Sequence, residues 1–141
     1  MTDCIFCRIA AGELPAEVVL DTPRVLAFLD IAPVHYGHTL IIPRDHYQTL
    51  LDLPGDLWQE MGRAARLVAQ ALQQSFYARG FNLGMNNFEA AGQVVFHAHL
   101  HVIPRYQNDG LLLFPQGTYP PGDLAKVGQR LREALEVSSE R

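Results

Sequence analysis

Three histidines at alternate positions constrain the fold of this chain more than any other feature. Residues 96–103 read FHAHLHVI, with histidine at 97, 99 and 101. In a helix, side chains two residues apart point to nearly opposite sides, whereas in a strand they share one face at a spacing of about 6.6 Å. The alternation therefore predicts a strand over Val94 to Ile103 with three aligned imidazoles. The opposite face would pack apolar side chains against a helix, namely Phe96, Ala98, Leu100 and Val102.

The rest of the chain predicts four more strands and two helices. Apolar segments between turn residues indicate strands over Glu17–Leu20, Val25–Leu29, His38–Ile42 and Phe81–Met85. Apolar residues at three- and four-residue spacing, followed by Gly80 as a stop, predict the main helix over Asp56 to Ala78. A weaker stripe predicts a peripheral C-terminal helix, with Leu124, Val127, Leu131 and Leu135 on one side. We expect an α+β fold with a five-stranded, largely antiparallel sheet in a single domain, residues 1–141.

Size and charge argue against several classes of protein. A chain of 141 residues is typical of one domain, and none of its apolar runs approaches the roughly 20 residues that cross a bilayer. The formal net charge of -4, without a Lys/Arg cluster, argues against nucleic acid as a partner and favours a small phosphate-bearing ligand. The N-terminus holds Asp3 and lacks a basic segment before an apolar stretch. We therefore expect a cytoplasmic protein with no membrane partner.

The histidine row alone leaves three interpretations open. The imidazoles can form a solvated polar face, hold a catalytic metal, or act as nucleophile and hydrogen-bond donors toward a phosphate. A catalytic metal usually needs a nearby carboxylate, but no Asp or Glu follows His101 before Asp109. The chain also lacks a Walker glycine loop and an acidic metal cluster. These absences favour chemistry by the histidines themselves.

The two cysteines, Cys4 and Cys7, are three residues apart, which is the spacing of half a tetrahedral zinc site. A redox pair of the thioredoxin type would follow a strand and open a helix, and no strand is expected before residue 4. Two free buried cysteines are a further alternative. The spacing alone does not decide between them.

Residues 97–103 resemble the His-x-His-x-His-x-x motif, with x apolar, that names the histidine triad family. Other segments resemble blocks of the family in the family's order: residues 5–9, 12–15, 27–33, 37–46 and 91–93. The likeness covers about residues 3–106. It leaves 107–141 as a C-terminal extension that carries the peripheral helix. The N-terminal cysteine pair and the Ile103-Pro104-Arg105 sequence resemble the bacterial members.

This resemblance implies a hydrolase that cleaves the α-phosphate bond of small purine nucleotide derivatives. Adenosine phosphoramidates, aminoacyl adenylates and dinucleoside polyphosphates are the candidate substrates. By position, His99 matches the nucleophile that forms a nucleotidyl-histidine, and His101 matches the contact to the transferred phosphate. His38 matches an upstream histidine that helps to set the hydrogen bonds of the triad. His97 is the first of the three triad histidines. The family also implies a homodimer formed through about Asp56 to Met85.

The resemblance also implies a purine nucleotide pocket. Asp30 matches the carboxylate that binds the ribose hydroxyls, and Asn86 and Gln93 match polar groups near the phosphate and leaving group. Asn87 competes with Asn86 for that position. The base-binding wall corresponds to six apolar residues, each of which is as readily explained as ordinary core: Ile5, Phe6, Ile9, Leu14, Phe28 and Ile31.

Two further expectations follow from the resemblance. Some members with this cysteine pair use it for zinc, completed by residues that match His46 and His97, so the structural ligand set here would be Cys4, Cys7, His46 and His97. No organic cofactor is expected. Val94 stands where the phosphoramidase branch often has a serine near the leaving group. The alternative function is therefore a nucleotide-binding or scaffolding protein with little turnover.

Overall fold

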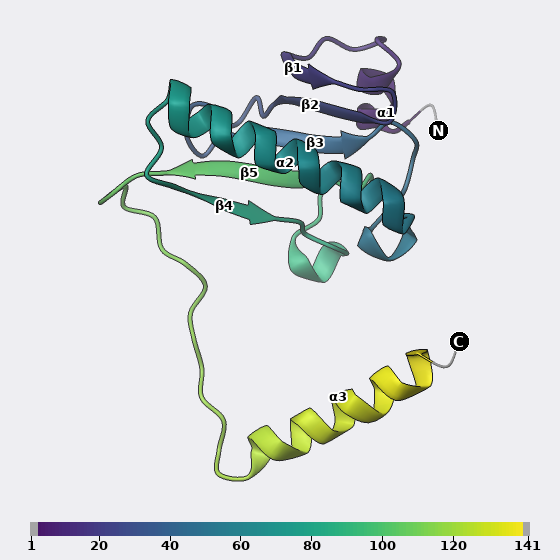
Figure 1. The fold of residues 1–141 in the computed structure, drawn as a ribbon, viewed down its shortest axis with the longest axis vertical. Coiled ribbons are helices and arrows are strands. Elements are labelled where there is room, and N and C mark those ends of the chain that lie inside the picture. Colours follow the sequence, from purple (N-terminus) through teal and green to yellow (C-terminus); the bar gives the residue numbers. More distant parts are fainter. Residues whose placement is uncertain (1–2, 140–141) are drawn as a thin grey trace. The chain divides into compact units, whose positions relative to one another are not determined.

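The computed structural model describes residues 3–139 and divides into two compact units, one ending at Asp109 and one beginning at Gly110 (Figure 1). The helices of the first unit are α1 (Ile5–Ala10) and α2 (Gly55–Ser75), with two short 3-10 helices at Leu50–Asp52 and Glu89–Ala91. Its strands are β1 (Val18–Asp21), β2 (Val25–Leu29), β3 (Thr39–Pro43), β4 (Gly80–Gly84) and β5 (Leu100–Arg105). The second unit contains α3 (Asp123–Ser139).

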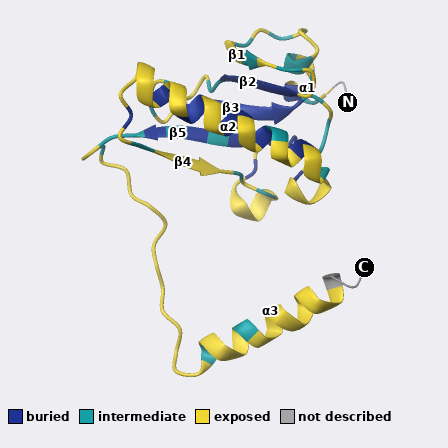
Figure 2. Ribbon diagram, in the orientation of Figure 1, coloured by how far each residue is buried: buried dark blue, intermediate teal, exposed yellow. Residues whose placement is uncertain are grey.

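The five strands form one antiparallel sheet in the order β1-β2-β3-β5-β4. The central strands are buried, whereas most residues of β1 and β4 at the two edges are exposed (Figure 2). This confirms the expected α+β fold with a five-stranded, largely antiparallel sheet.

The two faces of the sheet bury different sets of side chains. Val25, Ala27, Ile41, Leu100 and Val102 join the apolar side of α2 in the larger core cluster. The alternate residues of β2 and β3 lie on the other face in a second cluster with Phe6 of α1, namely Leu26, Phe28, Leu40 and Ile42. The sheet therefore lies between α2 and α1, and the α1 side carries the histidines described below.

The strand expected over Val94 to Ile103 is wrong in its first half, because β5 begins only at Leu100. The pairing of Ile41 with Leu100 places Pro43 opposite Ala98, and proline has no N–H to continue a ladder. His97 and His99 therefore precede the strand, and only His101 belongs to it. Of the four apolar residues expected against the helix, Phe96 is also wrong, since it is 41% exposed while the other three are buried.

Two other elements differ from expectation. Residues 5–10 form a helix, α1, which no periodic pattern in the sequence predicted. The main helix ends at Ser75 rather than Ala78, because Tyr77 adopts a φ of 55° that no α-helix accommodates. The remaining expected strands agree with the structure to within one residue at each end.

The second unit contains the expected C-terminal helix, and Leu124, Val127, Leu131 and Leu135 are exposed on it. None of the helices within residues 3–139 is both long and apolar enough to span a bilayer.

Candidate active site

Helix α1 begins with a sulfur cap. Cys4 is its N-cap residue, and the Cys4 Sγ accepts a hydrogen bond of 3.3 Å from the backbone N–H of Cys7. The three-residue spacing thus brings both thiols to the first turn of the helix. Phe6 lies between them in sequence and packs into the core under the sheet, which fixes the helix in place.

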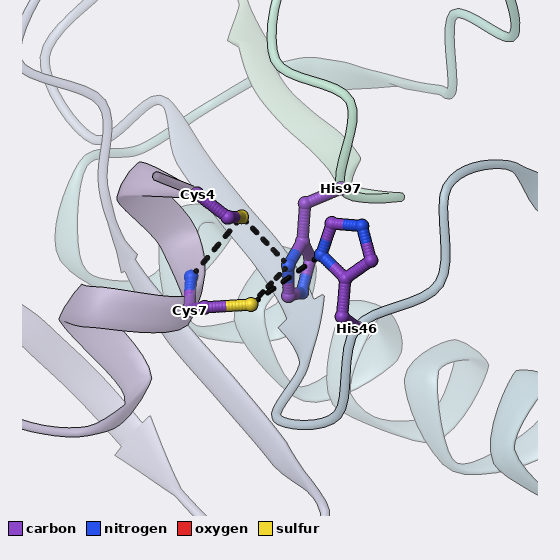
Figure 3. A group of neighbouring side chains, drawn as sticks. All are labelled: Cys4, Cys7, His46 and His97. Atoms are coloured by element: carbon purple, nitrogen blue, oxygen red, sulfur yellow. Dashed lines mark hydrogen bonds between the residues drawn. The ribbon is translucent and has the colours of Figure 1, made fainter. Parts of the chain in front are cut away.

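Both sulfurs lie beside two histidine rings from other parts of the chain (Figure 3). Cys4 Sγ is 3.3 Å from His97 Nδ1, and Cys7 Sγ is 3.4 Å from His46 Nδ1 and 3.5 Å from His97 Nδ1. All four ligand atoms lie within 4.8 Å of one another. Tetrahedral zinc with its usual bond lengths separates a sulfur and a nitrogen ligand by roughly 3.5 Å. Cys4, Cys7, His46 and His97 therefore have the spacing and the donor atoms of a four-ligand zinc site.

The protonation state of His97 also suits a metal ligand. Its Nε2 donates to the carbonyl oxygen of Pro43 at 2.8 Å, so in the neutral ring Nδ1 carries the lone pair that faces the sulfurs. Burial lowers the pKa of His97 to about 4, which keeps the ring neutral. Burial raises the pKa of the Cys7 thiol to about 11, so a bound cation would have to displace its proton.

His99 has one nitrogen committed and one available. Its Nδ1 donates to the backbone carbonyl of His97 at 2.7 Å, because a carbonyl oxygen can only accept. Burial lowers the pKa of the ring, partly offset by this hydrogen bond, and the imidazole is neutral at pH 7. Phe6 meets the ring edge-on with centroids 5.1 Å apart. The remaining nitrogen, Nε2, is left with a free lone pair.

A chain of hydrogen bonds orients His101. The backbone N–H of Val34 donates to His38 Nδ1 at 3.1 Å, so the proton of neutral His38 resides on Nε2. His38 Nε2 lies 2.9 Å from His101 Nδ1 and donates to it, which leaves the proton of His101 on Nε2. Burial lowers the pKa of His38 and, together with its histidine neighbours, lowers that of His101 to about 4. Both rings are therefore neutral, and His101 offers an N–H donor.

A cavity of about 650 Å³ opens beside these rings. His99, His101, Asp30 and Asn86 give it one polar region, and the six residues expected to form the base-binding wall all line it. Val94, expected near the leaving group, also lines the cavity, and the lining that sequence reasoning missed consists of Pro15, Ala16, Leu29, Ala32, Leu40, Gly92 and Val95. These carry no functional group that a sequence pattern would single out. The cavity thus combines a mainly apolar lining with imidazole, carboxylate and amide groups.

Some expected site residues lie elsewhere. Gln93 does not line the cavity: its side-chain amide accepts from the Phe88 N–H and donates to the carbonyls of Gln48 and Val95. Asn87 accepts from the N–H of Leu50 and likewise lies outside the cavity lining. His38 lies behind His101, and His97 belongs to the cysteine cluster rather than to the cavity.

Comparison with known proteins shows the family of this chain. The chain matches the HIT domain over residues 11–108, which is more than half of its length. It belongs to the HIT family, named for the histidine triad. Protein hit of Bacillus subtilis is 39% identical over 140 residues, covering 96% of this chain and 97% of the relative. Adenylylsulfatase HINT3 of Arabidopsis thaliana is 41% identical over 109 residues, covering 77% of this chain and 55% of the relative.

Solved structures of the HIT family share the fold. A Zn-bound histidine triad family protein from Mycobacterium smegmatis has a TM-score of 0.75 and 35% identity, covering 99% of both chains. A histidine triad nucleotide-binding protein from Candida albicans has a TM-score of 0.85 and 30% identity, covering 96% of this chain and 99% of that one. The resemblance to the histidine triad family is therefore confirmed.

Proposed function

We propose that this HIT protein hydrolyses small purine nucleotide derivatives, cleaving a bond at the α-phosphorus through a nucleotidyl intermediate on His99. The observation that carries the proposal is the hydrogen bond from His99 Nδ1 to the His97 carbonyl. It leaves a neutral Nε2 on a residue that lines the cavity. A neutral imidazole held in this way is a nucleophile that needs no separate base. The likeness to an adenylylsulfatase and to a nucleotide-binding protein supports a nucleotide as the substrate.

The cavity suits the parts of a nucleotide. The purine would contact the apolar wall, where Phe6 and Phe28 pack edge-on with centroids 5.5 Å apart. Asp30 also lines the cavity, and a carboxylate accepts hydrogen bonds from both hydroxyls of a ribose. Asn86 would face the phosphate or the leaving group. The substrate's α-phosphorus would then lie near His99.

The reaction takes two displacements. His99 Nε2 attacks the α-phosphorus, a P–N bond forms, and the bond from phosphorus to the leaving group breaks. The ring becomes cationic, and the His97 carbonyl that accepts from Nδ1 stabilises that charge. Water then attacks phosphorus, the P–N bond breaks, and a nucleoside monophosphate leaves with the neutral ring restored. The net reaction consumes one water, whose proton and hydroxyl end on the leaving group and the phosphate.

His101 stabilises the charge that develops on the phosphate. Its Nε2–H is fixed by His38 and points away from that ring, so it is available to a phosphate oxygen. Donors oriented before the reaction stabilise a transition state more than mobile water does, because they need no reorganisation. The preorganised donor and the buried nucleophile are neighbours, with ring centroids 5.1 Å apart.

Zinc is proposed for the cysteine cluster as a structural ion. Cys4, Cys7, His46 and His97 would fill all four tetrahedral positions and leave none for substrate. The ion would tie α1 to the segment before β5 and so hold Phe6 against His99. The Zn-bound relative from Mycobacterium smegmatis supports this assignment.

A homodimer is proposed through α2 and β4. The edge strand β4 is mostly exposed, with Phe81 44% and Leu83 50% accessible. On α2, Trp58 is also exposed, at 39%. Unpaired edges and exposed apolar side chains are features that a second copy would cover. Light scattering at micromolar concentration should give twice the mass of one chain, and a monomer would contradict the proposal.

A substrate panel tests the function. Adenosine phosphoramidate, an aminoacyl adenylate and diadenosine polyphosphates should yield AMP with the wild-type protein and none above background with His99→Asn. AMP affinity and thermal unfolding of the variant serve as controls that the pocket is intact. Tight AMP binding with equal, background release of AMP by both proteins would instead favour a nucleotide-binding role.

A further inference from the structure

The loop that carries Val34 and His38 contains another histidine, His35, which contacts a buried carboxylate. His35 Nε2 is 3.1 Å from Asp109 Oδ2, and the Asp109 side chain is only 7% exposed. Arg105 binds the same carboxylate through two nitrogens, at 2.7 and 2.9 Å, and the Tyr106 N–H donates to it at 3.2 Å. His35 is thus anchored to a carboxylate that β5 holds rigidly. Neither residue lines the nucleotide cavity.

His35 in turn fixes the loop that leads into β3. Its carbonyl accepts from the N–H of His38 at 3.0 Å, and the residue before it, Val34, donates to His38 Nδ1. Gly37 has a φ of 96°, and a Cβ there would meet Leu72 of α2 at 2.6 Å, so the turn has little room to shift on that side. On the other side, the loop is held by the His35–Asp109 contact. The position of the Val34 N–H therefore depends on His35.

The Val34 N–H at His38 Nδ1 favours one of two arrangements of protons, and Asp30 Oδ2, 3.6 Å from His38 Nε2, favours the same one. The neutral pair can carry its protons on His38 Nε2 and His101 Nε2, or on His38 Nδ1 and His101 Nδ1. In the first arrangement, His101 presents a donor to the phosphate; in the second, it presents a lone pair that repels a phosphate oxygen. A backbone N–H aimed at His38 Nδ1 excludes the second arrangement, because two donors would face each other.

We propose that His35 and Asp109 are positioning residues of the histidine triad, which hold the Val34 N–H where it fixes the tautomers of His38 and His101. The effect of this positioning on catalysis rests on the proposed function, whereas the tautomers of His38 and His101 do not depend on it. The relay runs from Asp109 through His35, the backbone of Val34 and His38 to the donor nitrogen of His101. It adds to the reaction two residues that touch neither substrate nor reacting atoms.

Imidazole tautomers are read directly by long-range 1H–15N correlation spectra of the full chain at pH 7.5. Wild-type protein should show His38 and His101 protonated at Nε2. His35→Ala should convert part of both signals to the Nδ1-protonated form, and Asp109→Ala, which removes the acceptor, should do the same. His35→Gln keeps a side-chain N–H donor for Asp109 and should restore the wild-type pattern. Tyr36→Ala is the matched control, because Tyr36 is the next residue of the same loop and is 83% exposed.

Kinetics with adenosine phosphoramidate give the second readout. His35→Ala should lower kcat about three- to tenfold, the effect of losing one orienting hydrogen bond, with KM within about twofold because the cavity lining is unchanged. His35→Gln should recover most of kcat, and Tyr36→Ala should match wild type.

Wild-type tautomers in His35→Ala, or an equal change in Tyr36→Ala, would overturn the proposal. Wild-type protein that turns over no nucleotide, combined with the expected tautomer change, would refute the proposed function while leaving the relay intact.

Discussion

Removing both sulfurs of the cysteine cluster should destabilise the fold strongly. In Cys4→Ser/Cys7→Ser, the serine at position 4 can still cap α1, so the change removes two of the four proposed metal ligands and keeps the helix start. Cys7 and His46 are 39 residues apart in sequence and in contact in the fold. In an unfolded chain, zinc would have to close that loop itself, at a cost of about 4 kcal/mol. The proposed zinc would therefore favour the folded state by about this amount.

A loss of about 4 kcal/mol corresponds to a fall in Tm of roughly 15 °C or more for a domain of this size. Elemental analysis of protein purified without chelator should give one zinc per wild-type chain and none in the double variant, and calorimetry should give the difference in Tm. Arg8→Ala is the matched control on the same helix, since its ion pair with Glu13 is exposed and contributes little. Wild-type protein with well under one zinc, or a fall in Tm no larger than that of Arg8→Ala, would refute the reasoning.

Three other predictions concern the site itself. His101→Ala should lower kcat by about 10²-fold with intact AMP binding, since it removes an oriented donor; an unchanged kcat in steady-state assays would contradict that role. Phe6→Ala should cost about 3–5 kcal/mol of unfolding free energy in urea titrations and raise KM; a loss below 1 kcal/mol would contradict its place in the core. Burial lowers the pKa of His101 to about 4 in the folded state. The unfolded chain therefore binds the proton first, and stability should fall as the pH drops from about 6.5 to 4. His101→Ala should flatten that slope, and an unchanged slope would argue against the buried neutral ring.

The spacing at which apolar residues repeat along the chain predicted most of the fold. Alternation identified β5 and its buried face through Leu100 and Val102, and helical spacing identified α2. The start of β5 was missed because it is set by Pro43 on a neighbouring strand, which local alternation does not report. Helix α1 was missed because six residues are too few to show a period, and a cysteine caps it.

In the site, too, local sequence patterns predicted some features and only the folded structure revealed others. The family motif pointed to His99 and His101, which line the cavity, and eight of the nine residues expected to contact the nucleotide line it as well. Gln93 does not, because its amide is consumed by three backbone groups that only the folded loop brings together. His35 and Asp109 are 74 positions apart and carry no local signal, so only the three-dimensional structure reveals their contact.

The nucleophile is tested most directly by trapping the intermediate. Wild-type protein mixed with labelled adenosine phosphoramidate and quenched rapidly without acid should carry an acid-labile nucleotidyl group, which mass spectrometry of peptides spanning residues 94–105 would locate on His99. The label should be absent from His99→Asn. An adduct on another histidine, or near wild-type turnover by His99→Asn, would contradict the account.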